Sequence, residues 1–296
     1  MTEKIDLINL YNQLKRPLIL DGAMGSLLIE KGIKNHPILW TSLSNLENPE
    51  IVKSIHLEYI NNGADIITTN TFRTNPISVH KSNEKINIEE FVKAGINIAK
   101  DARGNKKIII AGSNAPAEDC YQIERTVSLS ELEYNHKKHI DILWNNSVDI
   151  IWNETQSHMD EIEIICKYCS ENKIPFIVSL FFDENLKLLS GENLIDAVNY
   201  INSFNPVAIG FNCVKPETFL KFIEKYSLPE RWGFYFNCGA GNYDDEFLTC
   251  GISPKHYSEL TKQLLKFYPT FVGSCCGSNP EHTKAIKELL DEIYRN

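Results

Sequence analysis

Three of the eight cysteines in the chain lie where short apolar runs end. Cys213 follows "PVAIGFN", and the adjacent pair Cys275 and Cys276 follows "PTFVGS". Three thiolates suit Zn²⁺, a borderline-soft ion that prefers four ligands, and three protein ligands leave one position open, as in catalytic zinc sites. These thiols are therefore the candidate metal ligands and Zn²⁺ the candidate cofactor. The alternative is that all three are buried, inert cysteines.

A zinc ion with three thiolate ligands would favour one kind of chemistry. Its net charge is about −1, so it activates water poorly but can still bind a further thiol as thiolate. Free cysteine-like thiols have a pKa of about 8.5 and are mostly protonated at neutral pH, so coordination is what makes such a thiol nucleophilic. We therefore expect alkylation of a small thiol, with the three cysteines acting in catalysis through the metal-bound thiolate.

Two carboxyl groups close other apolar runs. Asp21 ends "PLILD", and Glu154 ends "VDIIWNE". Together they could hold the ammonium of an amino-acid thiol through charge-assisted hydrogen bonds. Backbone N–H groups of "DGAMGS", which contains Gly22, could bind its carboxylate near the start of a short helix. Alternatively, Asp21 caps this helix and Glu154 is an ordinary loop carboxylate.

The remaining cysteines and histidines give weaker signals. The C-x-x-C at 166–169 lies inside a helical pattern, so Cys166 is interpreted as a buried helix residue rather than a redox or zinc ligand. Cys238 is not expected to bind the metal, Cys120 and Cys250 show no partner pattern, and His158 could reach the site. The helical histidines are expected to be solvated: His56, His136, His139, His256 and His282.

Eight short apolar runs alternate with helical patterns along the chain. Continuous apolar runs are typical of strands covered on both faces, and they fall at 17–21, 64–69, 107–112, 148–154, 175–180, 206–212, 232–237 and 269–274. Helices are predicted at 49–62, 84–101, 128–146, 159–172, 192–203, 216–226, 256–267 and 280–294. Ser278 and Glu281 fit a capping box for the last one.

This alternation favours the α/β class and a single (β/α)8 TIM barrel covering 1–296, with 1–15 as an extra N-terminal helix. A doubly wound open sheet is the alternative. Active sites of such barrels gather at the C-terminal ends of the strands, where Asn70 is also placed. No strand ends in lysine, which argues against Schiff-base chemistry, and no glycine-rich phosphate loop follows the last two strands.

Composition limits the partners of the chain. Its 296 residues are 43% apolar and 23% charged, with a net charge of −9, so neither nucleic acid nor anionic membrane is an expected partner. No apolar run could span a membrane, and the N-terminus lacks the features of a signal peptide. We expect a cytoplasmic protein with small-molecule substrates, and either a monomer or a homo-oligomer.

Six motifs in the chain, taken together, resemble the landmarks of the zinc-dependent homocysteine S-methyltransferase family over about 15–295. They are "LILDGAMGS", "GADIITTNTF", "DIIWNET", "GFNC", "YFNCGAGNYDD" and "VGSCCGSNPEH". The resemblance implies a (β/α)8 barrel with zinc on Cys213, Cys275 and Cys276. It also implies homocysteine bound by Asp21 and Glu154, and Asn237 as a resting fourth ligand that the substrate displaces.

The implied reaction transfers a methyl group from a sulfonium or ammonium donor to homocysteine and gives methionine. The loop "GSNAPAEDCY" departs from the "GSVGPYG"-like loop of many members that use S-methylmethionine or S-adenosylmethionine, and "NCG" departs at the seventh strand. Those two donors and betaine therefore stay open, with Phe72 a candidate wall of the donor side. Alternatives are another small thiol or selenol as acceptor, and a non-catalytic zinc-binding barrel that works with a corrinoid partner.

Overall fold

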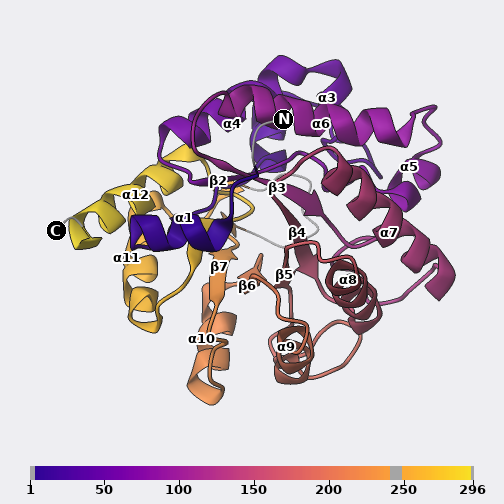
Figure 1. Cartoon of the computed structure of the whole chain (residues 1–296). Helices are drawn as coiled ribbons and strands as arrows, with labels where there is room; N and C mark the ends of the chain where they lie inside the picture. Colours follow the sequence, from indigo (N-terminus) through magenta and orange to yellow (C-terminus); the bar gives the residue numbers. More distant parts are fainter. Residues whose placement is uncertain (1–3, 241–248, 295–296) are drawn as a thin grey trace.

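Eight parallel strands form the centre of the computed structural model, which describes residues 4–240 and 249–294 (Figure 1). Their order around the sheet is β1-β10-β7-β6-β5-β4-β3-β2, and a parallel bridge between Leu20 and Ile66 joins the two ends. The predicted (β/α)8 barrel is therefore confirmed. The stretch 241–245, part of the motif "YFNCGAGNYDD", lies outside the described residues.

The strands agree with the eight apolar runs of the sequence. They are β1 (Leu18–Ile19), β2 (Ile66–Thr68), β3 (Ile109–Asn114), β4 (Ile150–Gln156), β5 (Phe176–Leu180), β6 (Ala208–Asn212), β7 (Trp232–Phe236) and β10 (Phe271–Ser274). A short antiparallel ladder, β8 (Gly239–Ala240) with β9 (Thr249–Cys250), follows β7. Every described residue of the eight barrel strands except Thr68 and Glu154 is buried, as expected for strands covered on both faces.

Helices surround the barrel and return the chain from the end of one strand to the start of the next. The long ones are α4 (Pro49–Asn61), α6 (Ile88–Arg103), α7 (Leu129–Asn145), α8 (Met159–Glu171), α9 (Leu194–Asn202), α10 (Pro216–Lys225), α11 (Pro254–Leu264) and α12 (Pro280–Tyr294). Short ones are α2 (Gly25–Glu30), α3 (Ser44–Glu47), α5 (Pro76–Ser82) and η1 (Leu265–Phe267). Within the described residues, no helix is long and apolar enough to cross a membrane.

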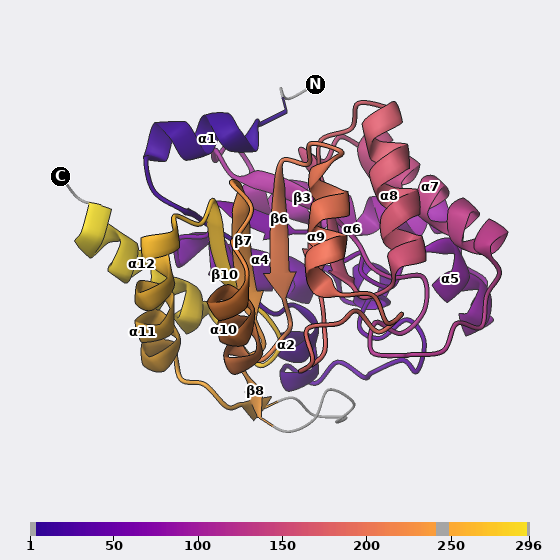
Figure 2. The ribbon, with the colours of Figure 1, turned by 90° about the horizontal axis from the view of Figure 1, so that it is seen from below.

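The extra N-terminal helix is present as α1 (Leu7–Leu14). It lies across the end of the barrel at which the strands begin (Figure 2), where Leu7 and Leu10 join the apolar cluster that fills the barrel interior. The backbone N–H of Ile5 also donates to Asp149, 2.9 Å away, which itself pairs with Arg103. This end is therefore closed, and the opposite end is left for a site.

The predicted capping box of α12 is wrong. The helix begins at Pro280, and the Asn279 side chain accepts a hydrogen bond from the N–H of Glu281 at 3.1 Å. The Ser278 hydroxyl instead accepts from the N–H of Ala23 at 3.1 Å. Ser278 therefore joins the loop after β10 to the loop after β1, a tertiary role that a local capping pattern does not reveal.

Four of the five histidines expected to be solvated are buried, and only His256 is exposed. His136 lies 2.5 Å from a Glu161 carboxylate oxygen, His139 bonds to Asn114, and His282 bonds to the carbonyl of Ile252. The prediction took charged neighbours in the sequence as a sign of exposure. Each helix, however, packs one face against the barrel, and these histidines lie on that face. Neutral imidazole can be buried there when it finds a partner, as His136, His139 and His282 do, whereas neither ring nitrogen of His56 has a partner among the described residues.

Candidate active site

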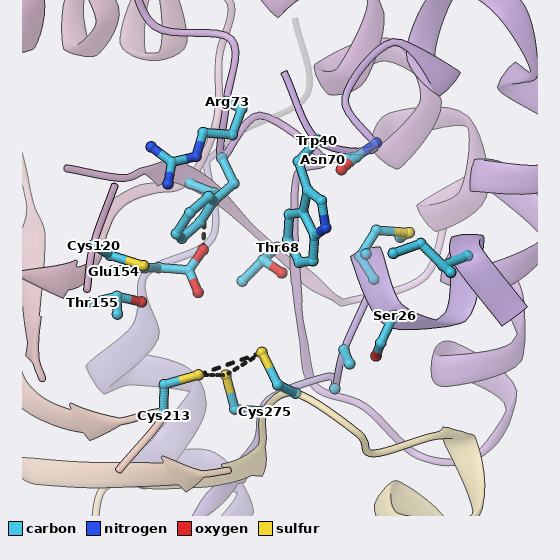
Figure 3. A pocket seen from close by; sticks show the side chains of 18 of the residues that line it. Ser26, Trp40, Thr68, Asn70, Arg73, Cys120, Glu154, Thr155, Cys213 and Cys275 are labelled. Atoms are coloured by element: carbon cyan, nitrogen blue, oxygen red, sulfur yellow. Dashed lines mark hydrogen bonds between the residues drawn. The ribbon is translucent and has the colours of Figure 1, made fainter. Parts of the chain in front are cut away.

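A cavity of about 1250 Å³ opens at the C-terminal end of the barrel. Residues of β4 and β7 and of the loops after β1, β2, β3, β6 and β10 line it, so seven of the eight barrel strands contribute to one space. Figure 3 shows Cys213 and Cys275 on one side of this space and Arg73 and Trp40 on the other, with Glu154 and Thr68 between them in this view. Except for Asn237, all residues that the sequence placed in the site line the cavity.

Cys213, Cys275 and Cys276 converge at the floor of the cavity. Their sulfur atoms are 2.8 Å (213–275), 3.5 Å (213–276) and 3.9 Å (275–276) apart, too far for a disulfide, which needs about 2.05 Å. Tetrahedral ligands with zinc–sulfur bonds of about 2.3 Å would lie about 3.8 Å apart. Two of the three separations are close to this value and the third has to widen by about 1 Å, so the donor set fits zinc.

The backbone aims these thiols with conformations that few residues adopt. Cys213 has a φ of 57°, in the left-handed region, which costs on the order of 1–3 kcal/mol for a residue other than glycine. Its N–H donates to the carbonyl of Tyr235 at 3.0 Å, and the N–H of Cys275 donates to Phe236 at 2.8 Å. Gly277 has a φ of 75°, and a Cβ there would lie 2.5 Å from Gly239. Strand β7 thus holds both cysteine segments.

The three thiols also interact with one another and with a tyrosine. Hydrogen bonds from Cys213 and Cys275 lower the pKa of Cys276 well below that of an ordinary thiol. The Tyr121 hydroxyl, on the loop after β3, donates to the Cys213 sulfur at 3.4 Å. The cluster can therefore hold one thiolate, on Cys276, before a metal ion enters, while Cys275 and Cys213, which accepts from Tyr121, have a raised pKa.

Asp21 lies at the end of β1, only 2% exposed, and its carboxylate accepts from the N–H of Thr68 at 2.9 Å. Burial raises its pKa well above the usual value, the hydrogen bond from Thr68 opposes the rise, and the nearby Glu154 adds to it. Helix α2 receives no side-chain cap, so the alternative capping role of Asp21 is not observed. A buried carboxyl group of this kind would gain from a cationic ligand.

Glu154 faces the same cavity from β4. The hydroxyl of Ser113 donates to its carboxylate at 2.5 Å. Burial nevertheless raises its pKa to about 7. The next residue, Thr155, has a φ of 55°, and its N–H donates to the Asn212 side chain at 3.0 Å. Because Asn212 directly precedes Cys213, one contact fixes both the carboxylate and the thiol segments.

Gly22, Asn70 and Phe72 line the cavity, as expected. A Cβ on Gly22 would lie 2.7 Å from the Ser278 hydroxyl, so only glycine fits there. The Asn70 side chain donates to Asn45 at 3.0 Å, which leaves its position well defined. The Phe72 ring lies edge-on to Trp40, with 6.2 Å between the ring centroids.

Three other residues lie away from this space. Asn237 is not among the described residues that line the cavity, and its side-chain oxygen accepts from the N–H of Gly239 at 2.7 Å. Its role as a fourth ligand stays a prediction. His158 bonds to the carbonyl of Ile123 at 3.0 Å, so it does not turn toward the cavity. Cys238 is buried, and its N–H donates to the carbonyl of Cys276 at 2.8 Å.

Sequence reasoning missed several residues that line the cavity. They are Trp40, Arg73, Cys120 and Tyr121, all on loops rather than at strand ends. The structure explains Gly25 of "DGAMGS", because a Cβ there would lie 2.2 Å from the Trp40 ring, but the sequence does not reveal this contact. The others follow strands by several residues, and their direction depends on how the loops fold.

An α/β barrel with a three-cysteine cluster and two carboxyl groups, one buried and one half-buried, at the C-terminal mouth defines the class of this protein. The family model of homocysteine S-methyltransferase matches residues 18–290. The chain belongs to the homocysteine S-methyltransferase family, a family of methyltransferase enzymes that act on small molecules, as the six motifs indicated.

Relatives agree along almost the whole length. Homocysteine S-methyltransferase 1 of Arabidopsis thaliana is 23% identical over 92% of this chain and 93% of its own. The selenocysteine Se-methyltransferase of Brassica oleracea is also 23% identical, over 92% of this chain and 88% of its own. The homocysteine methyltransferase MmuM of Escherichia coli, in its metallated form, shares the fold with a TM-score of 0.79 and 20% identity over 96% of this chain and 99% of its own.

Proposed function

We propose that this enzyme transfers a methyl group from a sulfonium or ammonium donor to the thiol of homocysteine, with methionine as the product and zinc as the cofactor. The observation that carries the proposal is the convergence of three thiols, 2.8–3.9 Å apart, in a cavity that Asp21 and Glu154 also line. When bound by Cys213, Cys275 and Cys276, zinc supplies an electrophilic centre that keeps the substrate sulfur ionised at neutral pH.

The two carboxyl groups would hold the ammonium of homocysteine. Both have a raised pKa in the free protein because burial penalises their charged forms. A cation between them offsets this penalty and lowers both pKa values. Part of the binding free energy therefore comes from pairing carboxylates that are unfavourably buried in the free protein. The hydrogen bonds from Thr68 and Ser113 orient the two groups in advance.

The carboxylate of homocysteine would lie against the loop after β1. Gly25 and Ser26 form the first turn of α2 and line the cavity, and their N–H groups have no acceptor among the described residues. Such groups attract anions. With the ammonium at Asp21 and the carboxylate near Ser26, the side chain of homocysteine points toward the cysteines.

The methyl donor would enter from the opposite side, past the aromatic pair Trp40 and Phe72. Aromatic faces attract cations, so this wall suits a sulfonium or ammonium group. In the transfer, the methyl–sulfur or methyl–nitrogen bond of the donor breaks and its electron pair stays on the donor, which leaves neutral. A new carbon–sulfur bond forms on homocysteine, whose thiol proton has passed to solvent on binding.

The test is methionine formation by zinc-loaded, reduced protein given homocysteine and S-methylmethionine, S-adenosylmethionine or betaine in turn. We expect turnover with at least one donor and none after chelation of the metal. If no donor gives methionine although the metal is bound, the proposal fails, and a non-catalytic barrel that needs a corrinoid partner becomes the better account.

A second acceptor is favoured by one comparison, the similarity to a selenocysteine Se-methyltransferase. A selenol ionises more readily than a thiol, and it could bind at the same three cysteines at the floor of the cavity. Competition between homocysteine and selenocysteine for the same donor distinguishes the two acceptors, and the one with the larger kcat/KM is the one for which the site is built.

A further inference from the structure

We propose that Arg73 is a specificity residue that binds a carboxylate on the methyl donor, so that this enzyme selects donors that are zwitterions. The proposal rests on the proposed function, since it names the chemical class of the donor. Arg73 lies on the loop between β2 and α5 and lines the cavity although it is only 9% exposed. Figure 3 shows it across the cavity from the cysteines.

The Arg73 guanidinium is held in place. Its Nη1 donates to the carbonyl of Glu118 at 2.5 Å, and its central carbon lies 5.3 Å from the centre of the Phe72 ring. The loop that carries it is fixed as well, because the hydroxyl of Thr71 donates to Ser113 at 2.7 Å. A binding group held this firmly loses little conformational entropy when a ligand arrives.

Most of the donor capacity of Arg73 is unused. A guanidinium has five N–H groups, and among the described residues only one of them makes a hydrogen bond. Its one ion pair, to Asp119, is 3.7 Å long and joins a carboxylate that is 61% exposed. Water screens such a pair, so it neutralises Arg73 weakly.

Other arginines with largely buried side chains in the described chain are differently placed. Arg103 lies 2.9 Å from Asp149, and Arg125 lies 2.7 Å from Glu161, and both carboxylates are almost fully buried. Arg16 pairs with Asp65 at 2.7 Å. Arg73 alone of these four faces the cavity, and it alone pairs only with a mainly exposed carboxylate, since Asp119 is 61% exposed and Asp65 is 14% exposed. Its position suits an anion that comes from outside the chain.

The charges that line the cavity indicate that this anion is a carboxylate on the methyl donor. Asp21 and Glu154 favour cations, and a simple onium ion would be repelled by the guanidinium when it approached the Phe72 ring. A donor that carries a carboxylate beside its onium centre meets both requirements, with the onium on the aromatic pair and the carboxylate on Arg73. A guanidinium fork binds carboxylate through two parallel hydrogen bonds. The acceptor has its own anion site in the turn near Ser26, on the other side of the cavity.

The experiment is calorimetric binding of a donor panel to the zinc-loaded full chain, which needs no turnover. The panel contains S-methylmethionine, S-adenosylmethionine and betaine, which carry carboxylates, and trimethylsulfonium and tetramethylammonium, which do not. We expect a carboxylate donor to bind the native protein at least 10-fold more tightly than either simple onium. In Arg73→Gln, its affinity should fall about 10- to 100-fold, with the simple onium ions unchanged or tighter.

Two further variants separate the effect of the guanidinium from that of positive charge alone. Arg73→Lys retains the charge but not the fork, and should show an intermediate loss. Lys81→Gln removes another cation that lines the cavity, but one already paired with Glu118 at 2.6 Å, and should change donor affinity less than 3-fold. Zinc content and homocysteine affinity should match the native protein in all three.

Three results would overturn the proposal. They are equal binding of simple onium ions and zwitterions, a loss of homocysteine rather than donor affinity in Arg73→Gln, and no detectable binding of any carboxylate donor. The first two leave the proposed methyl transfer standing, whereas failure of the proposed function would show as absent methionine with the metal bound. The two failures are therefore distinguishable.

Discussion

The two sides of the cavity are built in different ways. On the thiol side, Cys213, Cys275 and Cys276 follow directly on β6 and β10, and backbone hydrogen bonds to β7 fix them. On the donor side, Trp40, Arg73 and Tyr121 lie on loops whose shape depends on buried side-chain contacts. In the proposed function, the barrel itself would therefore provide the metal chemistry, and the loops would provide the choice of donor.

Behind the donor side is a network of buried charges. Glu161 accepts hydrogen bonds from His136 and from the N–H of Ala117, and it pairs with Arg125. Glu118 pairs with Lys81. These contacts hold the loop after β3, which carries Tyr121 to the cysteines. Because the two sides are built differently, a substitution on the thiol side should remove activity altogether, whereas one on the donor side should change which methyl donor is used.

The largest expected effect is on the thiol side. Cys213→Ala removes one of three ligands, and we expect loss of bound zinc together with loss of methyl transfer, measured by metal analysis and by methionine formation. Cys166→Ala is the matched control, since Cys166 is equally buried but lies on the outer helix α8. Full zinc content in Cys213→Ala would refute its assignment as a ligand.

Glu154→Gln should come next, with a homocysteine KM about 10- to 100-fold higher, because a hydrogen bond to a charged group is lost in a buried site. Zinc content should stay unchanged. Glu154 has a pKa of about 7, so the native KM for homocysteine should fall as the pH rises from about 5.5 to about 7.5, as the carboxylate ionises. The variant should keep only the pH dependence that release of the homocysteine thiol proton causes, and an unchanged KM would remove Glu154 from the ammonium site.

The same raised pKa has a consequence for the stability of the ligand-free protein. The folded state binds the Glu154 proton more tightly than the unfolded chain does, so the associated stabilisation is present at low pH and lost as the pH rises through about 7. Added homocysteine should raise the Tm more at pH 8 than at pH 6. A larger shift at pH 6 would contradict the proposed ammonium contact.

A smaller effect is expected on the donor side from Trp40→Ala. Loss of one aromatic face should raise the donor KM about 5- to 30-fold, the effect of about 1–2 kcal/mol, and leave zinc and homocysteine binding unchanged. Trp40→Phe keeps an aromatic ring, so its donor KM should lie between those of the native protein and Trp40→Ala. If Trp40→Ala lowers zinc content instead, the two sides are not separable in the way described above.

Tyr121→Phe should give the smallest effect and tests the point where the two sides meet. It removes a long hydrogen bond of 3.4 Å to the Cys213 sulfur, so zinc affinity should fall about 3-fold, as measured by competition with a chelator. Donor affinity should be unchanged. Equal zinc affinity in the variant would show that the contact has no influence on the ligand.

Much of the fold could be predicted from the sequence, because barrel strands buried on both faces read as short apolar runs. The site residues at strand ends could be predicted for the same reason: once the barrel is recognised, Asp21, Glu154 and the cysteines must share one mouth. Trp40, Arg73 and Tyr121 could not, because long loops are directed by contacts between distant residues. The buried histidines and the Ser278 bond to Ala23 were missed for the same reason.

The central claim is that three protein sulfurs share a metal ion that has room for the sulfur of the substrate. X-ray absorption at the zinc edge, with and without homocysteine, tests it most directly. We predict three sulfur ligands and one lighter ligand in the free enzyme, changing to four sulfurs at about 2.3 Å when homocysteine binds. Fewer than three sulfurs in the free enzyme, or a sulfur count that homocysteine leaves unchanged, would contradict the account.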